Sequence, residues 1–170
     1  MKLMTILALV ILFSLTYVCC TKNSESKGLI TISGITERDN SANSIGNIDT
    51  TDWKFTDSWS LSEENLFKKN TSSNMVTETI RPNSSYVVGG YPNPAKTLIY
   101  FAFQLEPNMY YDIRIVDNNL NIKLQFDSVK YSLITMKDSA YLNNELYRIY
   151  YKVHSDNMVY RGHGDFKFIK

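Results

Sequence analysis

The stretch Leu146-Tyr147-Arg148-Ile149-Tyr150-Tyr151-Lys152-Val153 decides the fold class, because its side chains alternate in character. In an extended chain every second side chain points to the same face. One face collects the aromatic and branched residues Tyr147, Ile149, Tyr151 and Val153, and the other collects Arg148, Tyr150 and Lys152. This period of two predicts a β-strand with one buried face and one half-wet face.

Four further segments share this aromatic and β-branched character. They are 97–105, 110–116, 122–129 and 158–169. Short polar joints connect neighbouring segments: Glu106-Pro107-Asn108, Asp117-Asn118-Asn119 and Ser155-Asp156-Asn157. Asn, Asp and Pro all accept turn geometry. Short antiparallel strands separated by such turns predict a mainly β fold, a β-sandwich over residues 86–170.

Two motifs in this region carry a family resemblance. Gly90-Tyr91-Pro92-Asn93-Pro94-Ala95-Lys96 precedes a Leu-Ile-Tyr-Phe strand, and Ile113-Arg114-Ile115-Val116-Asp117-Asn118 follows later. With these motifs, residues 86–170 resemble the type A C-terminal sorting domains of the type IX secretion system. The two prolines fix a rigid entry to the first strand and remove backbone donors at the sheet edge. The resemblance implies an immunoglobulin-like sandwich and, as one alternative, an export signal.

A second resemblance covers the whole chain. Thr51-Asp52-Trp53, a second tryptophan at Trp59 and Leu66-Phe67 all precede the Tyr-Pro-Asn-Pro motif. In this arrangement the chain is similar to short bacterial lipoproteins with no assigned activity. The comparison implies a fold and a location, and it implies no reaction.

The N-terminus has the pattern of an export signal. Lys2 supplies a positive charge, and residues 4–18 are almost all hydrocarbon, interrupted by Thr5, Ser14 and Thr16. A membrane-spanning helix needs about 20 apolar residues, whereas a polar run begins already at Thr21. Residues 1–19 are therefore predicted to be a cleavable signal peptide.

A cysteine pair, Cys19 and Cys20, ends this apolar run, and the chain contains no other cysteine. A cysteine in this position is typical of lipoproteins, whose thiol receives a diacylglyceryl group. The peptidase that processes lipoproteins prefers a small residue just before the modified cysteine. Cys20 is therefore the predicted lipidation site, because the small Cys19 precedes it, whereas the β-branched Val18 precedes Cys19. Cys19 is the alternative. Several acyl chains, at about 0.8 kcal/mol per buried methylene, would hold the protein on a bilayer. The other interpretations are that both cysteines are discarded with the signal or form a disulfide.

Residues 20–85 are predicted to be a tether and an irregular segment. A short strand is expected at 29–32, a loop at 38–51 and a further strand at 75–80 within a polar stretch. Ser60 with Glu63 three residues on matches a capping box, so a short helix is expected over 61–67. We expect Trp53 and Trp59 to pack on the domain, and a ligand platform is the alternative.

Charge excludes one class of partner. The chain has 18 Lys and Arg against 17 Asp and Glu, a net charge of +1, and the signal segment removes Lys2 and no acid. Nucleic-acid binding requires clustered cations, and the longest basic cluster is Lys68-Lys69. We therefore expect no nucleic-acid partner.

A search for reaction chemistry gives weak candidates. His163 and Asp165 lie in Gly162-His163-Gly164-Asp165, where an imidazole beside a carboxylate would suit acid–base work. Glycines in a strand more often mark a bulge or a close backbone approach, which is the preferred interpretation. Asp49, Asp52 and Asp57 are near one another, but their spacing is not that of an EF-hand, and capping explains them equally well. No catalytic, cofactor-binding or metal-binding residue is therefore assigned.

These observations predict a lipoprotein of the cell envelope, in the outer membrane and facing either the periplasm or the cell surface. Its sandwich is expected to be a non-catalytic binding or structural module. The predicted partners are the lipid bilayer and an envelope protein or glycan. A secreted type IX cargo is the alternative, and an enzyme that uses His163 and Asp165 is the third hypothesis.

Overall fold

The computed structural model describes residues 29–56, 58–68, 79–81, 88–104, 106–137, 145–155 and 158–169. The predicted signal peptide, Cys19 and Cys20 lie outside the described residues. The described elements are β1 (Lys54–Phe55), α2 (Leu61–Asn65), β2 (Thr79–Arg81), β3 (Val88–Tyr91), β4 (Leu98–Phe103), β5 (Tyr110–Val116), β6 (Ile122–Val129), β7 (Leu133–Lys137), β8 (Leu146–Ser155) and β9 (Met158–Lys167). Among the described residues, no helix is long and apolar enough to cross a membrane.

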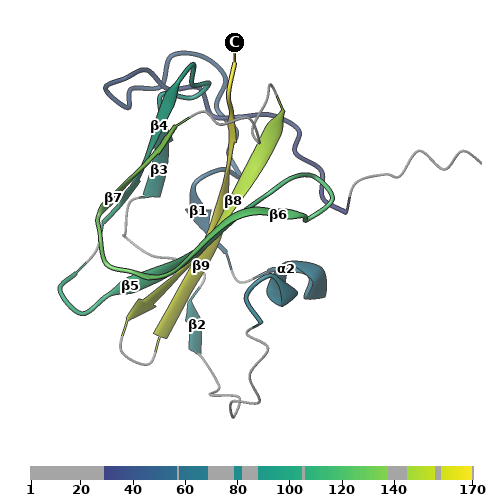
Figure 1. Cartoon of the computed structure of the whole chain (residues 1–170), viewed down its shortest axis with the longest axis vertical. Coiled ribbons are helices and arrows are strands. Elements are labelled where there is room, and N and C mark those ends of the chain that lie inside the picture. Colours follow the sequence, from purple (N-terminus) through teal and green to yellow (C-terminus); the bar gives the residue numbers. More distant parts are fainter. Residues whose placement is uncertain are drawn as a thin grey trace, which may run out of the picture.

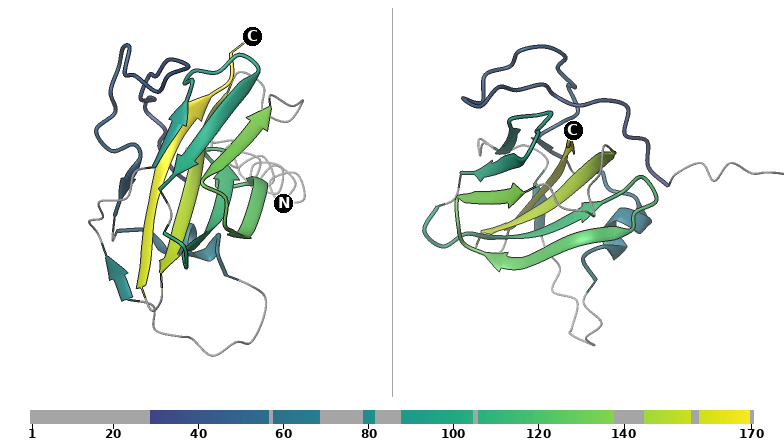
Figure 2. Two further views of the ribbon diagram at one scale, coloured as in Figure 1. Left: turned by 90° about the vertical axis from the view of Figure 1, so that its left-hand side faces the viewer. Right: turned by 45° about the horizontal axis from the view of Figure 1, so that its top comes forward.

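These strands form two sheets (Figure 1). The larger sheet has the order β1-β9-β8-β5-β6, and β2 pairs with β9. The smaller sheet has the order β3-β4-β7. All described pairings are antiparallel except that of β2 with β9. Figure 2 shows the smaller sheet over one face of the larger sheet, an arrangement consistent with the predicted β-sandwich.

The core lies between the sheets and is largely aromatic. Tyr147, Ile149, Tyr151 and Val153 of β8 are each at most 1% exposed, so the period-two prediction for this face is confirmed. Phe101 of β4 contacts Phe166 of β9 edge to face, with ring centroids 5.2 Å apart. Phe103 of β4 stacks on Tyr111 of β5 at 4.1 Å. Because each such ring buries a large apolar area, these contacts supply much of the force that holds the sheets together.

The opposite face of β8 is drier than predicted. Tyr150 is fully buried and Arg148 and Lys152 are only partly exposed. The segment around α2 covers them: Trp59 stands edge to face on Tyr150, with centroids 5.3 Å apart, and stacks on Phe67 at the same distance. The half-wet prediction therefore agrees with Arg148 and Lys152 and was wrong for Tyr150, because a segment from the N-terminal half packs on that side chain.

Trp53 fills a slot between the two sheets. A Cβ on Gly164 of β9 would lie 2.6 Å from Trp53 Cε2, and a Cβ on Gly90 of β3 would lie 2.7 Å from Cζ2 and Cη2 at the far end of the indole. Each sheet therefore has a glycine, which carries no side chain, where it contacts the indole. The core interpretation of Trp53 is confirmed, and the close-approach interpretation of the glycines around His163 is confirmed with it. The bulge interpretation was wrong, because β9 pairs with β8 without a register break.

Several strand predictions agree with the structure. The bounds of β5 and β6 match the predicted segments, and β4, β8 and β9 lie on their predicted segments with ends shifted by a few residues. The capping box is present, since Ser60 and Glu63 bond each other's backbone, and α2 ends two residues before the predicted Phe67. β3 and β7 were not predicted. The predicted strand at 29–32 was wrong, because Ile30 N–H instead donates to Asn118 O in the turn after β5.

The segment predicted to be irregular also contributes to the domain. Trp53 is part of the core cluster, and β1 pairs with the edge of β9 through Lys54 and Phe55. Of the predicted strand at 75–80, the structure describes residues 79 and 80, which lie in β2. The folded unit therefore includes residues well before position 86.

Candidate functional site

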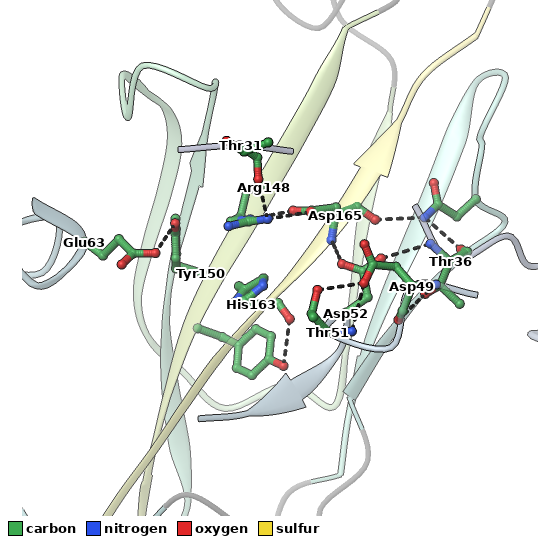
Figure 3. Close-up of polar contacts among 12 residues, drawn as sticks. Thr31, Thr36, Asp49, Thr51, Asp52, Glu63, Arg148, Tyr150, His163 and Asp165 are labelled. Atoms are coloured by element: carbon green, nitrogen blue, oxygen red, sulfur yellow. Dashed lines mark hydrogen bonds and ion pairs between the residues drawn. The ribbon is translucent and has the colours of Figure 1, made fainter. Parts of the chain in front are cut away.

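The most chemically unusual part of the described chain is a group of buried polar side chains beside β9. We call Thr36, Asp52, Asn93, Arg148 and Asp165 the polar joint (several are labelled in Figure 3). It connects the N-terminal segment, the turn after β3, β8 and β9. The hydrogen bonds of these groups decide whether they can act on a ligand or only stabilise the fold.

Two side chains of the joint take the place of a missing neighbour strand. Asp165 N–H donates to Asp52 Oδ1 at 2.9 Å, and Asn93 Nδ2 donates to Asp165 O at 2.9 Å. Asp52 Oδ2 also accepts from Thr36 N–H, and Asn93 Nδ2 also donates to Thr36 O. Buried backbone groups of a strand edge require partners. Asp52 and Asn93 provide them here and at the same time fasten residue 36 to β9.

Arg148 and Asp165 form a two-pronged ion pair across β8 and β9. Arg148 Nε lies 2.6 Å from Asp165 Oδ1, and the same guanidinium donates from Nη2 to Oδ2 at 2.7 Å. The side chain of Asp165 is 1% exposed. Burial lowers the pKa of Arg148, but Asp165 more than offsets this and raises it, so Arg148 stays charged. Arg148 also donates to Thr31 O at 3.3 Å, which ties down the start of the described chain.

Of the two acids of the joint, Asp52 has the more strongly shifted pKa. Burial and, next in importance, the nearby Asp165 carboxylate raise its pKa to about 7, although its two backbone hydrogen bonds act in the opposite direction. A carboxyl with a pKa near neutrality can serve as a general acid or base. Asp52 is only 5% exposed, however, and both of its oxygens already accept backbone N–H groups. Its bonding is that of a structural group.

His163 does not form an acid–base pair with Asp165. The Asp165 carboxylate faces Arg148 in Figure 3, and the described hydrogen bonds of His163 are made by its backbone. His163 O accepts from Trp53 N–H at 2.8 Å and from Tyr151 Oη at 3.3 Å. Burial lowers the pKa of the His163 ring to about 4, so the ring is neutral at pH 7. The hypothesis of an enzyme built on these two residues gains no support from their geometry.

The three aspartates considered for calcium are not gathered around a common point. Asp49 Oδ1 accepts from Thr51 N–H and Thr51 Oγ1, which is turn capping, and Asp52 bonds Thr36 and Asp165. Asp57 lies outside the described residues. Among the residues that the structure describes, no three His, Cys, Asp or Glu side chains are placed to hold a metal ion.

A second cluster holds α2 against the outer face of the larger sheet. Arg114 lies 4.9 Å from the Phe67 ring centroid and donates from Nε to Leu66 O at 3.0 Å. Arg161 lies over Trp59 at 5.2 Å and pairs with Glu64. Tyr150 Oη donates to Glu63 Oε1 at 2.6 Å. Burial raises the pKa of Glu63, but the hydrogen bonds from Tyr150 and Ser60 more than offset this and lower it. Trp59 thus contacts Arg161 and the rings of Phe67 and Tyr150 of its own chain. These contacts favour the packing interpretation of Trp59 over a ligand platform.

The described surface contains an open hollow of about 790 Å³. It lies between the N-terminal segment and the turn after β5, and it is lined by Ile30, Thr31, Ile32, Asp117, Asn118, Asn119, Lys123, Glu145 and Leu146. Asp117 is occupied by Asn119, Asn121 and Lys123. The hollow therefore offers a mixed wall of amides, a carboxylate and short apolar side chains.

The polar joint was not predicted from the sequence. Asp165 was considered with His163 for acid–base work and Asp52 for calcium or capping, while Arg148 was assigned to a half-wet face and Asn93 to the proline-flanked entry of the first strand. The hydrogen-bonded partners within the joint lie 16 to 113 residues apart, so no local pattern reports them. One signal was present: a charged residue in the middle of a strongly aromatic strand, as Arg148 is, often needs a buried partner.

Comparison with protein-family models finds no match to this chain, and a search of the curated proteins finds no match either.

Proposed function

We propose that this chain is an outer-membrane lipoprotein of the cell envelope, anchored through Cys20 with Cys19 as the alternative, whose mainly β domain is a non-catalytic binding or structural module. The observation that carries the anchor is the sequence itself. An apolar run with a positive start stops at a cysteine pair and gives way at once to a polar segment. The domain would then face the periplasm or the cell surface.

The bonding of the polar joint supports the non-catalytic part of the proposal. Asp52, whose pKa is shifted toward neutrality, is buried and accepts hydrogen bonds from the backbone N–H groups of Thr36 and Asp165. Catalytic groups must reach a substrate. In Asp52 and Asp165 the reactive atoms are instead committed to internal partners.

The hollow beside Asn118 supports a binding role. Its amides and the Glu145 carboxylate can exchange hydrogen bonds with hydroxyl groups, while Ile30, Ile32 and Leu146 supply apolar contact. This mixture suits a glycan or a polar loop of an envelope protein. The near-neutral net charge of +1 fits such partners and does not fit nucleic acid.

A fatty-acid labelling experiment tests the anchor. Cells that express the full chain are fed an alkyne fatty acid, and the purified protein is examined for incorporated label. We expect labelling of the wild type and of Cys19→Ser, and loss of labelling in Cys20→Ser. Label in Cys20→Ser but not in Cys19→Ser would move the site to Cys19. Label that survives replacement of both cysteines, or no label in the wild type, would reject the anchor.

The order of the strands supports the immunoglobulin-like form of the sandwich, and the alternative function, a secreted type IX cargo whose C-terminal domain is a sorting signal, rests on the sequence motifs of that domain. When the strands from β3 to β9 are lettered A to G, the sheets have the orders A-B-E and G-F-C-D. Constant immunoglobulin domains combine A, B and E in one sheet and C, F and G in the other, and variable domains add an extra strand beside C. β6 stands in that added position.

Export of a reporter tests this alternative. One fusion carries residues 86–170 behind the reporter, and a second carries 29–170, because Trp53 and β1 belong to the same core. A sorting signal would bring the second fusion to the cell surface or the medium in a host with the secretion system. Retention of both fusions in the periplasm would reject it.

A further inference from the structure

The two edges of the larger sheet are treated differently. The edge of β9 is covered along its length: Thr56 N–H donates to Arg161 O, Trp53 N–H to His163 O, and Ala95 N–H to Lys167 O, with the polar joint between them. At the opposite edge lies β6, which in the described part of the chain pairs with β5 alone. Figure 2 shows β6 at the free margin of the sheet. An uncovered edge strand presents backbone groups to any strand that fits.

The middle of β6 is regular and partly apolar. Register shifts occur towards both ends of its pairing with β5, and between them Leu124, Gln125 and Phe126 pair in sequence with Ile115, Arg114 and Ile113. Leu124 and Phe126 therefore share the face of the core residues Ile113 and Ile115. Phe126 is 37% exposed and Ile122 is 43% exposed. This edge thus carries more apolar surface than a solvent-facing margin needs.

We propose that β6 pairs with β6 of a second copy of this chain, antiparallel and centred on Gln125, so that the larger sheet continues through the dimer. A twofold axis normal to the sheet places Lys123 of each copy opposite Asp127 of the other, and Leu124 opposite Phe126. Opposite charges and apolar residues directly across an antiparallel pair are both favourable. The strand is complementary to itself in this register, which identifies the partner as a second copy.

Other registers that keep the core faces aligned lose part of this match. Centring on Leu124 sets Ile122 against Phe126 but places Lys123 opposite Gln125, and centring on Phe126 places Leu124 opposite Ser128. Lys123 and Asp127 already pair within the chain, with Asp117 at 3.0 Å and Arg114 at 2.7 Å. Their side chains are still 31% and 35% exposed, so each can reach a second partner.

A charge exchange in the full-length purified protein tests the register, with sedimentation velocity as the readout. We expect the wild type to dimerise. Lys123→Asp makes both facing positions acidic and Asp127→Lys makes both basic, so each single variant should weaken the dimer by about tenfold or more. An equimolar mixture of the two should form a heterodimer, and the double variant should dimerise again. Circular dichroism checks that each variant is folded.

Cysteine cross-linking gives a second readout that does not depend on charge. Gln125 faces its own counterpart across the axis, within the Cα separation that a disulfide spans. Gln125→Cys should therefore cross-link under mild oxidation beyond the level of the wild type, which contains the same native cysteines, and Ser128→Cys should not. A wild type that stays monomeric at all concentrations, single charge variants that dimerise like the wild type, or equal cross-linking at 125 and 128 would each overturn the proposal.

Discussion

Replacing Gly164 with alanine should destabilise the protein through one side chain, the indole of Trp53. The new Cβ would lie 2.6 Å from Trp53 Cε2, well inside van der Waals contact, and the indole cannot retreat because Gly90 closes the other end of the slot. Trp53 is only 7% exposed. Overpacking of this kind typically costs about 1 to 3 kcal/mol. We expect the upper part of that range, since backbone on both sides confines the ring.

A double-mutant cycle isolates this mechanism. Free energies of unfolding are measured by urea denaturation and circular dichroism for the wild type, Gly164→Ala, Trp53→Leu and the double variant. Trp53→Leu removes the atoms that the new Cβ would strike, so Gly164→Ala should cost little in that background, which gives a coupling of about 1 kcal/mol or more. Gly34→Ala is the matched control, because its Cβ would meet Asn47 Nδ2 at an ordinary 3.5 Å. Equal costs of Gly164→Ala in both backgrounds would refute the reasoning.

Four further predictions concern the polar joint, His163 and α2. Asp165→Ala leaves Arg148 buried without its carboxylate and should cost about 3 kcal/mol or more, and adding Arg148→Met should recover much of this in thermal unfolding. Because burial raises the pKa of Asp52 to about 7, the folded state binds more protons between pH 4 and 7. The Asp52 contribution to stability therefore falls as pH rises, and Asp52→Asn should abolish that fall. For His163 the sign is opposite, because burial lowers the pKa of its ring to about 4. Its contribution to stability therefore rises from pH 4 to 6.5, and His163→Gln should abolish that rise. Denaturation at a series of pH values would contradict both if neither variant changed the slope. Ser60→Ala removes the cap of α2 and should cost about 1 kcal/mol in the free energy of unfolding, whereas no change would mean that the Glu63–Tyr150 hydrogen bond alone holds the helix.

The strands that the sequence predicted well are those whose pattern is local. β5 and β6 alternate over most of their length and are flanked by turn residues, so their bounds follow from local pattern. β7 has the same signal in weaker form, with Ile134 and Met136 toward the core, but it is short and mostly exposed. β3 contains Gly89 and Gly90, and glycine argues against a strand unless the indole that needs the space is known.

The polar joint is of the other kind, since its logic is visible only across the fold. From the local sequence, Asp52 looks like an acid in a loop and Asn93 like part of a turn. In the structure each forms a hydrogen bond with the backbone of Asp165, which is 113 residues from Asp52 and 72 residues from Asn93. No window of sequence contains both halves of such a bond. The sequence shows that β9 contains glycines and charged residues. It does not show which residues of the fold these positions contact.

Asp52 and Trp53 are adjacent on the chain and serve the two requirements that a sheet edge imposes. Trp53 fills the space between the sheets beside Gly164, while Asp52 accepts from the buried edge N–H of Asp165, the next residue of β9. A segment that performs both tasks cannot be exchanged for an arbitrary linker of equal length. The part of the chain before β3 is therefore needed for the edge of β9 to be buried at all, and this is why that edge is closed while β6, which no such segment reaches among the described residues, is left to meet a partner.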